Sequence, residues 1–314
     1  MGLAIGVDVG GTKVAAGVVD DEGKILAEVR RPTPSYSPEL TADAIVEVVG
    51  ELRAEHDVAA VGIGAAGFID ADRSTVLFAP NLAWRDEPLR DRVADRIGLP
   101  VIIENDANAA GWAEARFGAG RGESDIVCCT FGTGIGGSIV LGGRLHRGRW
   151  GIAGEPGHMQ VVRDGIRCGC GNRGCWEQYG SGKALTREAR EAAAASPLAA
   201  ETLLRLAGDI DGITGPIVTK AAQEGDPAAC AVFKDVAHWV GIGLANLAAI
   251  LDPGVFILGG GLSEAGDLLL EPARAAYAGQ LTGRGHRPIA EIRVAELGND
   301  AGLVGAADLA RLET

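Results

Sequence analysis

Short apolar runs alternate with helical patterns through the first hundred residues of the chain. The runs "LAIGVDVG", "VAAGVVD" and "ILAEVRR" are apolar or alternating, and glycine-rich or acidic turns separate them. A helical pattern follows over residues 38–56, where Ile45, Val48, Val49 and Leu52 recur at helical spacing. Strands that alternate with helices in this way are typical of an α/β domain.

The same order of strands and glycine-rich turns appears twice in the chain. The first half continues with a strand "AAVGIGAAG", a helix over residues 87–97, a strand "PVIIE" and a helix "ANAAGWAEARFG". At residue 124 the pattern restarts, because "DIVCCTFGTGIGGSIVLGGRL" repeats the strand, glycine-rich turn and second strand of "LAIGVDVGGTKVAAGVVDDEG". This weak internal repeat predicts two halves of related fold that face one another.

The second half is expected to end in alternating helices and strands. Asp226 can cap a long helix that has Pro227 in its first turn and that must end by Pro253. A strand "VFILGGG", a helix over residues 271–281, a strand "EIRVAEL" and a last helix "AGLVGAADLARLE" follow.

The length and net charge of the chain exclude some classes of binding partner. A chain of 314 residues is long enough for two domains, and its net charge of −13 argues against nucleic acid and against an anionic membrane surface. A small anionic ligand is still compatible with this negative charge, because backbone N–H groups bind phosphate without net positive charge. The chain shows neither a signal-peptide pattern nor an unbroken apolar run of about 20 residues, so we expect a cytoplasmic protein.

A glycine-rich turn, "DVGGTK", joins the first two strands. Gly10 and Gly11 let the backbone approach a ligand closely, and their N–H groups could surround phosphate oxygens together with Thr12 and Lys13. Asp8 ends an apolar strand, where a carboxylate needs water, a cation or a hydrogen-bond donor. An ordinary Gly-Gly hairpin is the alternative explanation.

The second glycine-rich turn, "GTGIGG", matches the GxGxxG pattern of dinucleotide-binding proteins. That function requires a helix next, whereas the β-type run "SIVLGGRL" follows, so we expect a second phosphate loop instead. Three further glycines end a later strand. They indicate either a place where the backbone approaches a flat ligand closely or a plain loop. The residues concerned are Gly132, Thr133, Gly134 and Gly137 in the turn, and Gly259, Gly260 and Gly261 after the later strand.

The segment "IIENDANAAGW" is the strongest candidate for a reactive carboxylate. Asn105 and Asp106 lie where a buried strand meets a helix, and ligands in α/β proteins bind beyond the carboxyl ends of strands. A single Asx residue here would be only a helix cap. Glu104 and Asn108 add to the cluster, and four polar residues are more than one cap needs.

A cysteine cluster, "IRCGCGNRGCWE", predicts a structural metal site. Cys168, Cys170 and Cys175 offer three thiolates, and His158 in "GEPGHMQV" offers the fourth ligand of a closed, tetrahedral zinc site. Three unrelated reduced cysteines are the alternative. The acidic residues Glu155 and Glu177 flank the cluster and are suited to accept hydrogen bonds from sugar hydroxyls. The other three cysteines, expected to fill the core, are Cys128, Cys129 and Cys230.

These motifs, taken together and in this order, resemble the ROK (repressor, open reading frame, kinase) family of sugar kinases. The resemblance rests on "DVGGTK", "ENDANAA", "EPGH" and "CGCGNRGCWE", and it runs from residue 3 to the C-terminal "AGLVGAADLAR". Within the family, the chain most resembles the ATP-dependent glucokinases of actinobacteria.

The resemblance implies an actin-like (ribonuclease H-like) duplicated fold, with two α/β domains around a central cleft. The small domain would be 1–112 plus 300–314, and the large domain 113–299. ATP phosphates would lie on the two glycine-rich loops, with the nucleoside near residues 259–261. The sugar contacts implied by the family are Gly67, Asn81, Asn105, Asp106, Glu155, His158 and Glu177.

The activity implied is transfer of the γ-phosphoryl group of ATP to the 6-hydroxyl of glucose, with Asp106 as general base. Mg²⁺ would lie near Asp8, and His158 would bind structural zinc through one ring nitrogen and sugar through the other. Family members are usually homodimers or homotetramers. The repressor branch has a preceding DNA-binding segment and the polyphosphate branch typically lacks the cysteine motif, so neither pattern fits this chain. An N-acetylhexosamine (GlcNAc or ManNAc) kinase and a non-catalytic sugar sensor remain open as alternatives.

Overall fold

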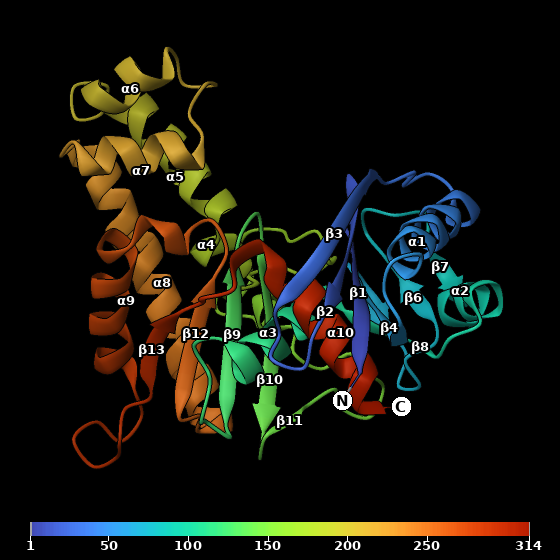
Figure 1. Cartoon of the computed structure of the whole chain (residues 1–314). Helices are drawn as coiled ribbons and strands as arrows, with labels where there is room; N and C mark the ends of the chain where they lie inside the picture. The colour runs from blue at the N-terminus through green and yellow to red at the C-terminus, as the bar shows by residue number, and fades with distance from the viewer. Residues whose placement is uncertain (1, 314) are drawn as a thin grey trace. The chain divides into compact units, whose positions relative to one another are not determined.

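The computed structural model describes residues 2–313, and its first mixed sheet is built from the N-terminal strands (Figure 1). The order in this sheet is β3-β2-β1-β4-β8. β1, β2 and β3 are antiparallel neighbours, whereas β4 and β8 run parallel to β1. The bounds are β1 Leu3–Val9, β2 Lys13–Val19, β3 Ile25–Pro32, β4 Val58–Ala65 and β8 Val101–Asn105.

The second sheet repeats this order. Its strands run β11-β10-β9-β12-β13, so each sheet places its third, second, first, fourth and fifth strands side by side. The internal repeat and the duplicated α/β topology predicted from the sequence are therefore confirmed. Strand β10 directly follows "GTG", which also confirms that no helix of the dinucleotide-binding kind begins there. The bounds are β9 Ile126–Phe131, β10 Ile135–Leu141, β11 Arg144–Leu145, β12 Val255–Gly259 and β13 Glu291–Val294.

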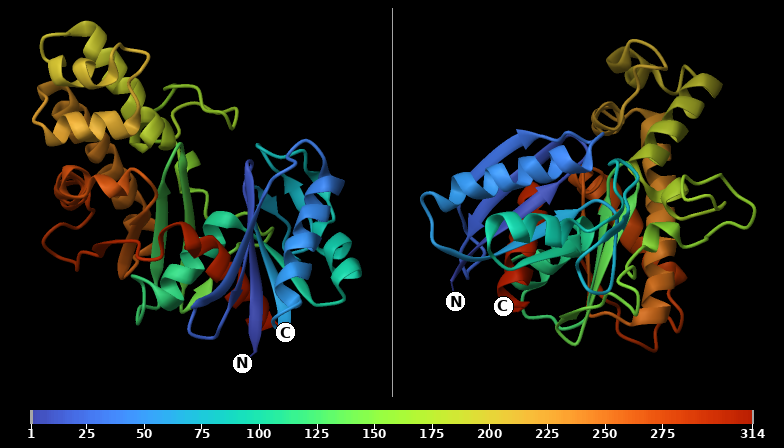
Figure 2. Two further views of the ribbon diagram at one scale, coloured as in Figure 1. Left: turned by 45° about the horizontal axis from the view of Figure 1, so that its top comes forward. Right: turned by 90° about the vertical axis from the view of Figure 1, so that its right-hand side faces the viewer.

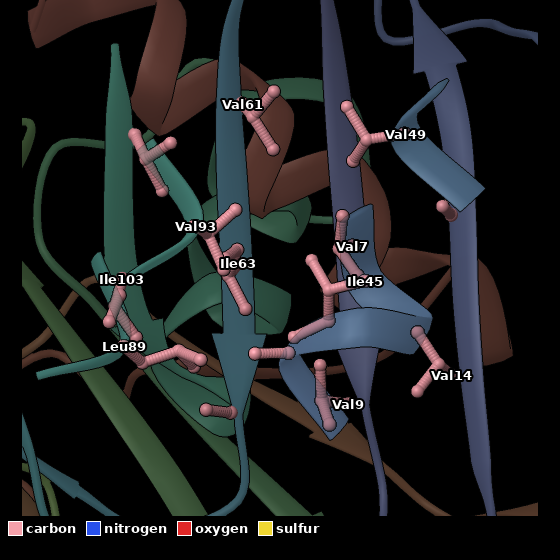
Figure 3. Packing of buried hydrophobic residues seen from close by; sticks show 14 of the residues in the cluster. Val7, Val9, Val14, Ile45, Val49, Val61, Ile63, Leu89, Val93 and Ile103 are labelled. Atoms are coloured by element: carbon pink, nitrogen blue, oxygen red, sulfur yellow. The ribbon is translucent and has the colours of Figure 1, made fainter. Parts of the chain in front are cut away.

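One face of the first sheet packs against α1 (Pro38–Arg53) and α2 (Leu89–Ile97). Alternate residues of β1, namely Ile5, Val7 and Val9, point into this core. Figure 3 shows Ile45 and Val49 of α1 against Val7 and its neighbours, and Leu89 and Val93 of α2 near Ile103. The branched side chains thus fill the space between the strands and these two helices.

The opposite face of the first sheet carries α3 (Asp106–Phe117) and α10 (Ala301–Glu313), and α10 is drawn in red against the blue strands in Figure 2. Glycines make this packing close: a Cβ on Gly6 would lie 1.9 Å from the Leu303 carbonyl oxygen, and one on Gly62 1.8 Å from that of Ala306. Gly305 makes the same approach to α3 at Ala109. Since Gly6 and Asp8 share one side of β1, Asp8 also points toward this face, near Gly302.

Helices of the second half pack around the second sheet. The long helix α8 (Pro227–Leu251) begins as expected, because the Asp226 side chain accepts a hydrogen bond from the Ala229 N–H and Pro227 occupies the first turn. Helix α9 (Asp267–Gln280) begins four residues before the expected start at residue 271, and Pro272 is accommodated inside it. The remaining helices are α4 Glu177–Gly180, α5 Gly182–Ala195, α6 Glu201–Ala207 and α7 Gly215–Gln223, with 3₁₀ turns η1 Pro156–His158, η2 Ser263–Ala265 and η3 Gly298–Asp300.

A small third sheet was not anticipated from the sequence. It has the order β5-β6-β7 and joins β5 (Phe68–Ile69), β6 (Val76–Phe78) and β7 (Arg85–Glu87). Strands of two or three residues are too short to show an alternating pattern, so nothing in the sequence marked them.

Within residues 2–313, one helix is long and apolar enough to cross a membrane by length and composition. That helix is α8, and 61% of its most apolar window is buried inside the protein. Such burial is what a core helix of this length shows.

The chain divides into two compact units. One comprises residues 1–127, 138–154 and 295–314, and the other comprises 128–137 and 155–294. The expected domain boundaries, 1–112 plus 300–314 and 113–299, stay a prediction.

Candidate active site

The junction of β8 and α3 brings three of the expected sugar-site residues together. Asn105 is the N-cap of α3, and its side-chain oxygen accepts a hydrogen bond from the Asn108 N–H at 3.0 Å. Its side-chain nitrogen lies 3.1 Å from the Gly67 carbonyl oxygen and 3.1 Å from Asp106 Oδ1. One amide therefore fixes the helix start, the loop after β4 and the Asp106 carboxylate.

The environment of Asp106 changes the pKa of its carboxyl group. Burial raises the pKa of its carboxyl group above the usual range, although the Ala107 N–H, 2.9 Å from Oδ1, opposes that shift. Burial, together with the charge of Asp106, also raises the pKa of Asp8 to about 6, while Lys13 lowers it. The two carboxylates repel one another, so a cation between them or beside them would be favourable.

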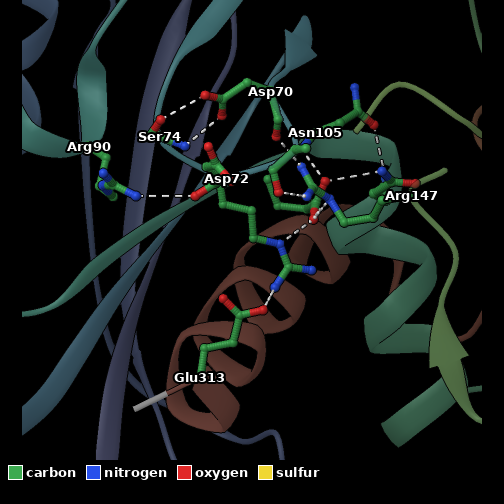
Figure 4. Close-up of polar contacts among 11 residues, drawn as sticks. Asp70, Asp72, Ser74, Arg90, Asn105, Arg147 and Glu313 are labelled. Atoms are coloured by element: carbon green, nitrogen blue, oxygen red, sulfur yellow. Dashed lines mark hydrogen bonds and ion pairs between the residues drawn. The ribbon is translucent and has the colours of Figure 1, made fainter. Parts of the chain in front are cut away.

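Glu104 explains why the polar cluster exceeds a simple helix cap. Its buried carboxylate forms ion pairs with Arg73 at 2.9 Å and with Arg147 at 2.7 Å. The other oxygen accepts hydrogen bonds from the Asn105 N–H at 2.9 Å and the Asn108 side chain at 3.1 Å. Figure 4 shows Asn105 and Arg147 within this network, which Glu313 of α10 joins by pairing with Arg73.

The first glycine-rich turn is tied down from the end of β3. Thr33 donates its hydroxyl to the Gly10 carbonyl oxygen at 2.8 Å and its N–H to the Thr12 carbonyl oxygen at 3.0 Å. The Thr12 and Lys13 side chains are exposed and accessible to a ligand. A Cβ on Gly11 would lie 3.3 Å from that of Asn81, so the turn and this expected sugar contact are neighbours.

The second glycine-rich turn contacts residues on both sides of it. The Gly132 carbonyl oxygen accepts a hydrogen bond from the Gly182 N–H at 2.9 Å. A Cβ on Gly134 would lie 2.5 Å from Glu177 Oε2, and one on Gly137 would lie 2.5 Å from Pro156 Cγ. The turn therefore connects the start of α5 with the acidic residue that follows the cysteine cluster.

A pocket of about 850 Å³ opens beside this turn, which is a volume suited to a nucleotide. Of the expected nucleotide contacts, Gly132, Thr133 and Gly261 line it. Its other walls come from α5, α7 and the loop after β12, and they contribute Gly182, Lys183, Thr219, Lys220 and Glu264, none of which the sequence singled out. The signal for the α5 contribution was present in "SGK", because Ser181 caps that helix at Gly182.

Glycines at Gly137 and Gly260 have a packing explanation. Gly260 adopts a φ of +83°, and a Cβ there would lie 2.6 Å from the Phe131 carbonyl oxygen. Gly259 is the last residue of the buried strand β12. Contact of Gly137, Gly259 and Gly260 with a nucleotide stays a prediction.

The structure brings the four expected metal ligands together. The ligand atoms of His158, Cys168, Cys170 and Cys175 all lie within 4.8 Å of one another. His158 Nδ1 is 3.6 Å from Cys168 Sγ, and the sulfurs of Cys170 and Cys175 are 3.6 Å apart. Ligand atoms bound tetrahedrally to zinc at about 2.0–2.3 Å lie roughly 3.5–3.8 Å from one another, so the donor set fits that metal.

The segment after the cluster anchors it to α8. Trp176 is buried, and its indole N–H donates to the Trp239 carbonyl oxygen at 2.7 Å. A Cβ on Gly243 would lie 2.0 Å from the Trp176 ring, so only glycine admits the indole there. The aromatic residue next to Cys175 is therefore held against the longest helix in the described part of the chain.

Glu177 is in direct contact with the cluster. The Cys168 thiol donates to Glu177 Oε1 at 2.9 Å, and burial together with this hydrogen bond raises the pKa of the thiol. His158 Nδ1 is 4.0 Å from the same oxygen. Glu155 is half-buried immediately before the 3₁₀ turn that carries His158.

The remaining cysteines follow expectation only in part. Cys128 and Cys129 are buried in β9, as predicted. Cys230 is exposed, so its assignment to the core is wrong. The buried stripe of α8 passes through residues 229, 232, 233 and 236, which leaves position 230 on the opposite face.

Comparison with known proteins gives full-length matches. The family model described as "ROK family" matches residues 4–313. A glucokinase of Streptomyces coelicolor is 54% identical over 312 residues, which cover 99% of this chain and 98% of the relative.

Two solved structures also match over nearly the whole chain. A crystal structure of a ROK family glucokinase from Streptomyces griseus, in complex with glucose and AMPPNP, is 55% identical, with a TM-score of 0.87 and coverage of 99% of this chain and 100% of that chain. A ROK hexokinase from Thermus thermophilus is 38% identical, with a TM-score of 0.84 and coverage of 99% and 98%.

Proposed function

Because the chain belongs to the ROK family, we propose that it is an ATP-dependent glucokinase, which transfers the γ-phosphoryl group of ATP to the 6-hydroxyl of glucose. The observation that carries the proposal is the half-buried Asp106 carboxylate, which Asn105 holds at a strand end and whose pKa is raised. The 55% identical protein bound to glucose and AMPPNP supports the choice of both substrates.

Asp106 acts as the general base in this proposal. Its raised pKa makes the carboxylate a stronger proton acceptor than an exposed aspartate would be. It accepts the hydroxyl proton as the sugar oxygen attacks phosphorus. A base of this kind typically contributes about 10²–10⁴ in rate.

The two glycine-rich turns bind the phosphates. In the first, Gly10, Gly11, Thr12 and Lys13 offer backbone N–H groups, a hydroxyl and an ammonium group. In the second, Gly132, Thr133 and Gly134 lead into the pocket, whose walls at Gly261, Lys183 and Lys220 suit a nucleoside and its phosphates. Since the transition state of phosphoryl transfer spreads charge over the phosphoryl oxygens, these donors stabilise it.

Asp8 is the carboxylate best suited to a magnesium ion. It is half-buried, the charge of Asp106 acts on it and its pKa is raised, which is the situation that a divalent cation relieves. Mg²⁺ bound with the phosphates supplies charge neutralisation during transfer.

The sugar is oriented by residues from both halves of the sequence. Gly67, Asn81, Asn105 and Asp106 would contact it from the first half, and Glu155, His158 and Glu177 from the second. Carboxylate and amide oxygens accept hydrogen bonds from hydroxyl groups in fixed directions. Orientation of the 6-hydroxyl toward Asp106 supplies much of the rate acceleration of a kinase.

The cysteine cluster would hold structural zinc through His158, Cys168, Cys170 and Cys175. Four protein ligands leave no open position, so the metal organises the chain and takes no part in phosphoryl transfer. Loss of the Cys168 thiol proton on metal binding would remove the hydrogen bond that Glu177 now accepts and leave that carboxylate available to the sugar.

We also propose a cytoplasmic location and assembly into a homodimer or homotetramer. A thiolate cluster needs a reducing compartment, which supports the location. Light scattering after size-exclusion chromatography would give the mass of the assembly directly.

The experiment that tests the function is ADP release with MgATP against glucose, N-acetylglucosamine, N-acetylmannosamine and fructose. We expect fast turnover on glucose alone, and loss of turnover in Asp106→Ala. Preference for an acetylated sugar would keep the mechanism and overturn the substrate. Glucose binding without turnover on any sugar would instead indicate a sensor.

A further inference from the structure

We propose that Glu104 is a positioning residue, which holds Asn105 and Asp106 in their working geometry by joining them to Arg73 and Arg147. This inference rests on the proposed role of Asp106. Glu104 itself is buried and acts through the residues that follow it. Its carboxylate is the point where strand β8, helix α3 and two arginines from elsewhere in the chain meet.

The two oxygens of Glu104 have separate partners. Oε1 accepts from the Asn105 N–H at 2.9 Å and from the Asn108 side chain at 3.1 Å. Oε2 lies 2.9 Å from Arg73 Nε and 2.7 Å from Arg147 Nε. One oxygen of the carboxylate therefore contacts the junction of β8 and α3, and the other oxygen contacts the two arginines.

The arginines extend this hold to the loop after β5. Arg147 donates to the Asp70 carbonyl oxygen at 2.8 Å and to that of Ala71 at 2.9 Å. Asp70 in turn accepts hydrogen bonds from Ser74 and Thr75, and these outweigh its partial burial and hold its pKa below the usual value. Figure 4 shows Asp70 bonded to Ser74 next to Arg147.

Arg73 supplies an independent argument. Its φ is +53°, in the left-handed region that disfavours a non-glycine residue. An asparagine or glycine would form this turn with less strain. The arginine is nevertheless there, it is buried, and its guanidinium reaches Glu104. The strain points to a role for the side chain, and its partners there are Glu104 through Nε and Glu313 through Nη1.

Glutamine cannot make all the contacts of this carboxylate. The amide introduced by Glu104→Gln would have one oxygen and one NH₂ group, so its oxygen could face the arginines or could accept from Asn105 and Asn108, but not both. The arginine charges would attract the oxygen, and the NH₂ group would then face the Asn105 N–H. Two donors in contact would displace Asn105 and, through it, Asp106.

The test compares Glu104→Gln with Glu114→Gln, a matched control on the adjoining helix α3. Glu114 is also buried, and it accepts backbone hydrogen bonds from Ala119, Glu296 and Leu297. Both variants should have a lower Tm. Below that Tm, we expect kcat of Glu104→Gln to fall roughly 10- to 100-fold with the KM for ATP unchanged, whereas Glu114→Gln keeps kcat within about twofold.

Retention of kcat in Glu104→Gln, with only the loss of Tm seen in the control, would overturn the positioning role. Should that variant fail to fold, Arg147→Met carries the same test, because it removes one of the two arginines and leaves Arg73 paired; a kcat close to that of the parent protein would overturn the proposal. Asp106→Asn, assayed in parallel, separates the two hypotheses: if it keeps its activity, the base assignment fails regardless of what Glu104 does.

Discussion

The two polar centres of this chain are held together by different means. Around Asp106, hydrogen bonds and ion pairs from Asn105, Glu104 and the two arginines fix the geometry with atoms that the chain itself supplies. Around His158 and the three cysteines, the ligand atoms lie within 4.8 Å of one another, in an arrangement that a bound metal would hold together. The first centre should therefore keep its geometry without metal, and the second should lose it.

Loss of the metal is the strongest way to test this difference. Cys170 is exposed, so Cys170→Ala removes a ligand without creating a cavity in the core. We expect loss of zinc and a glucose KM raised by about 10- to 100-fold, with kcat at saturating glucose largely kept. Metal analysis and steady-state kinetics on the same preparation measure both.

Cys230→Ala is the matched control, because that cysteine is exposed and lies outside the cluster on α8. It should keep both zinc and glucose affinity. A Cys170→Ala protein without zinc but with the parent affinity for glucose would mean that the cluster does not orient the sugar site.

Two substitutions within the second glycine-rich turn can separate the effect on sugar binding from the effect on nucleotide binding. A Cβ at position 134 would lie 2.5 Å from Glu177 Oε2, so Gly134→Ala must displace that flexible carboxylate. We expect a glucose KM raised by about tenfold, or about 1.4 kcal/mol, with little change in the KM for ATP. At position 132 a Cβ meets open space at the pocket wall, so Gly132→Ala should instead raise the KM for ATP.

Isothermal titration with glucose and with AMPPNP would measure the two effects without turnover. Equal effects of both alanine variants on both ligands would show that the turn acts as a unit and that the contact with Glu177 has no separate role.

At the Asp106 centre, removal of a carboxylate should increase the stability of the fold. The pKa of Asp8 is about 6 in the folded protein against an ordinary 3.8, so its neutral form stabilises the fold below pH 3.8 and that contribution is lost as the pH rises through 6. In the absence of metal and nucleotide, Asp8→Asn should raise the free energy of unfolding by about 1–3 kcal/mol at pH 7.5. The gain should shrink toward pH 4, while activity falls.

Urea denaturation at the two pH values measures this difference. Asp95→Asn serves as the control, because Asp95 is exposed on α2 and should change stability little at either pH. A variant at position 8 that is less stable than the parent protein at pH 7.5 would mean that the carboxylate is needed for folding.

Local features of the sequence predicted much of the fold and of the site. A capping aspartate and a proline marked the start of α8, and glycines between short apolar runs marked both turns. The cysteine spacing predicted a cluster that the chain folds into, and the repeated pattern predicted two sheets of one strand order.

Features that depend on distant partners were not predictable. Glu104 looked like one more polar residue at a helix start, because its arginines come from positions 73 and 147. Lys183 and Lys220 lie in different helices and share a pocket only in the folded protein. Cys230 was misassigned since the pattern around it did not reveal which face of α8 is buried.

Helix α10 has a consequence for how the protein is made. The first sheet consists of strands within residues 3–105, yet the glycines at positions 6 and 62 receive the backbone of residues 303 and 306. During translation, the part of this face that α10 covers stays exposed until residues 301–313 have been made. The nascent first half should therefore be a client of chaperones, and its completion is a late event in synthesis.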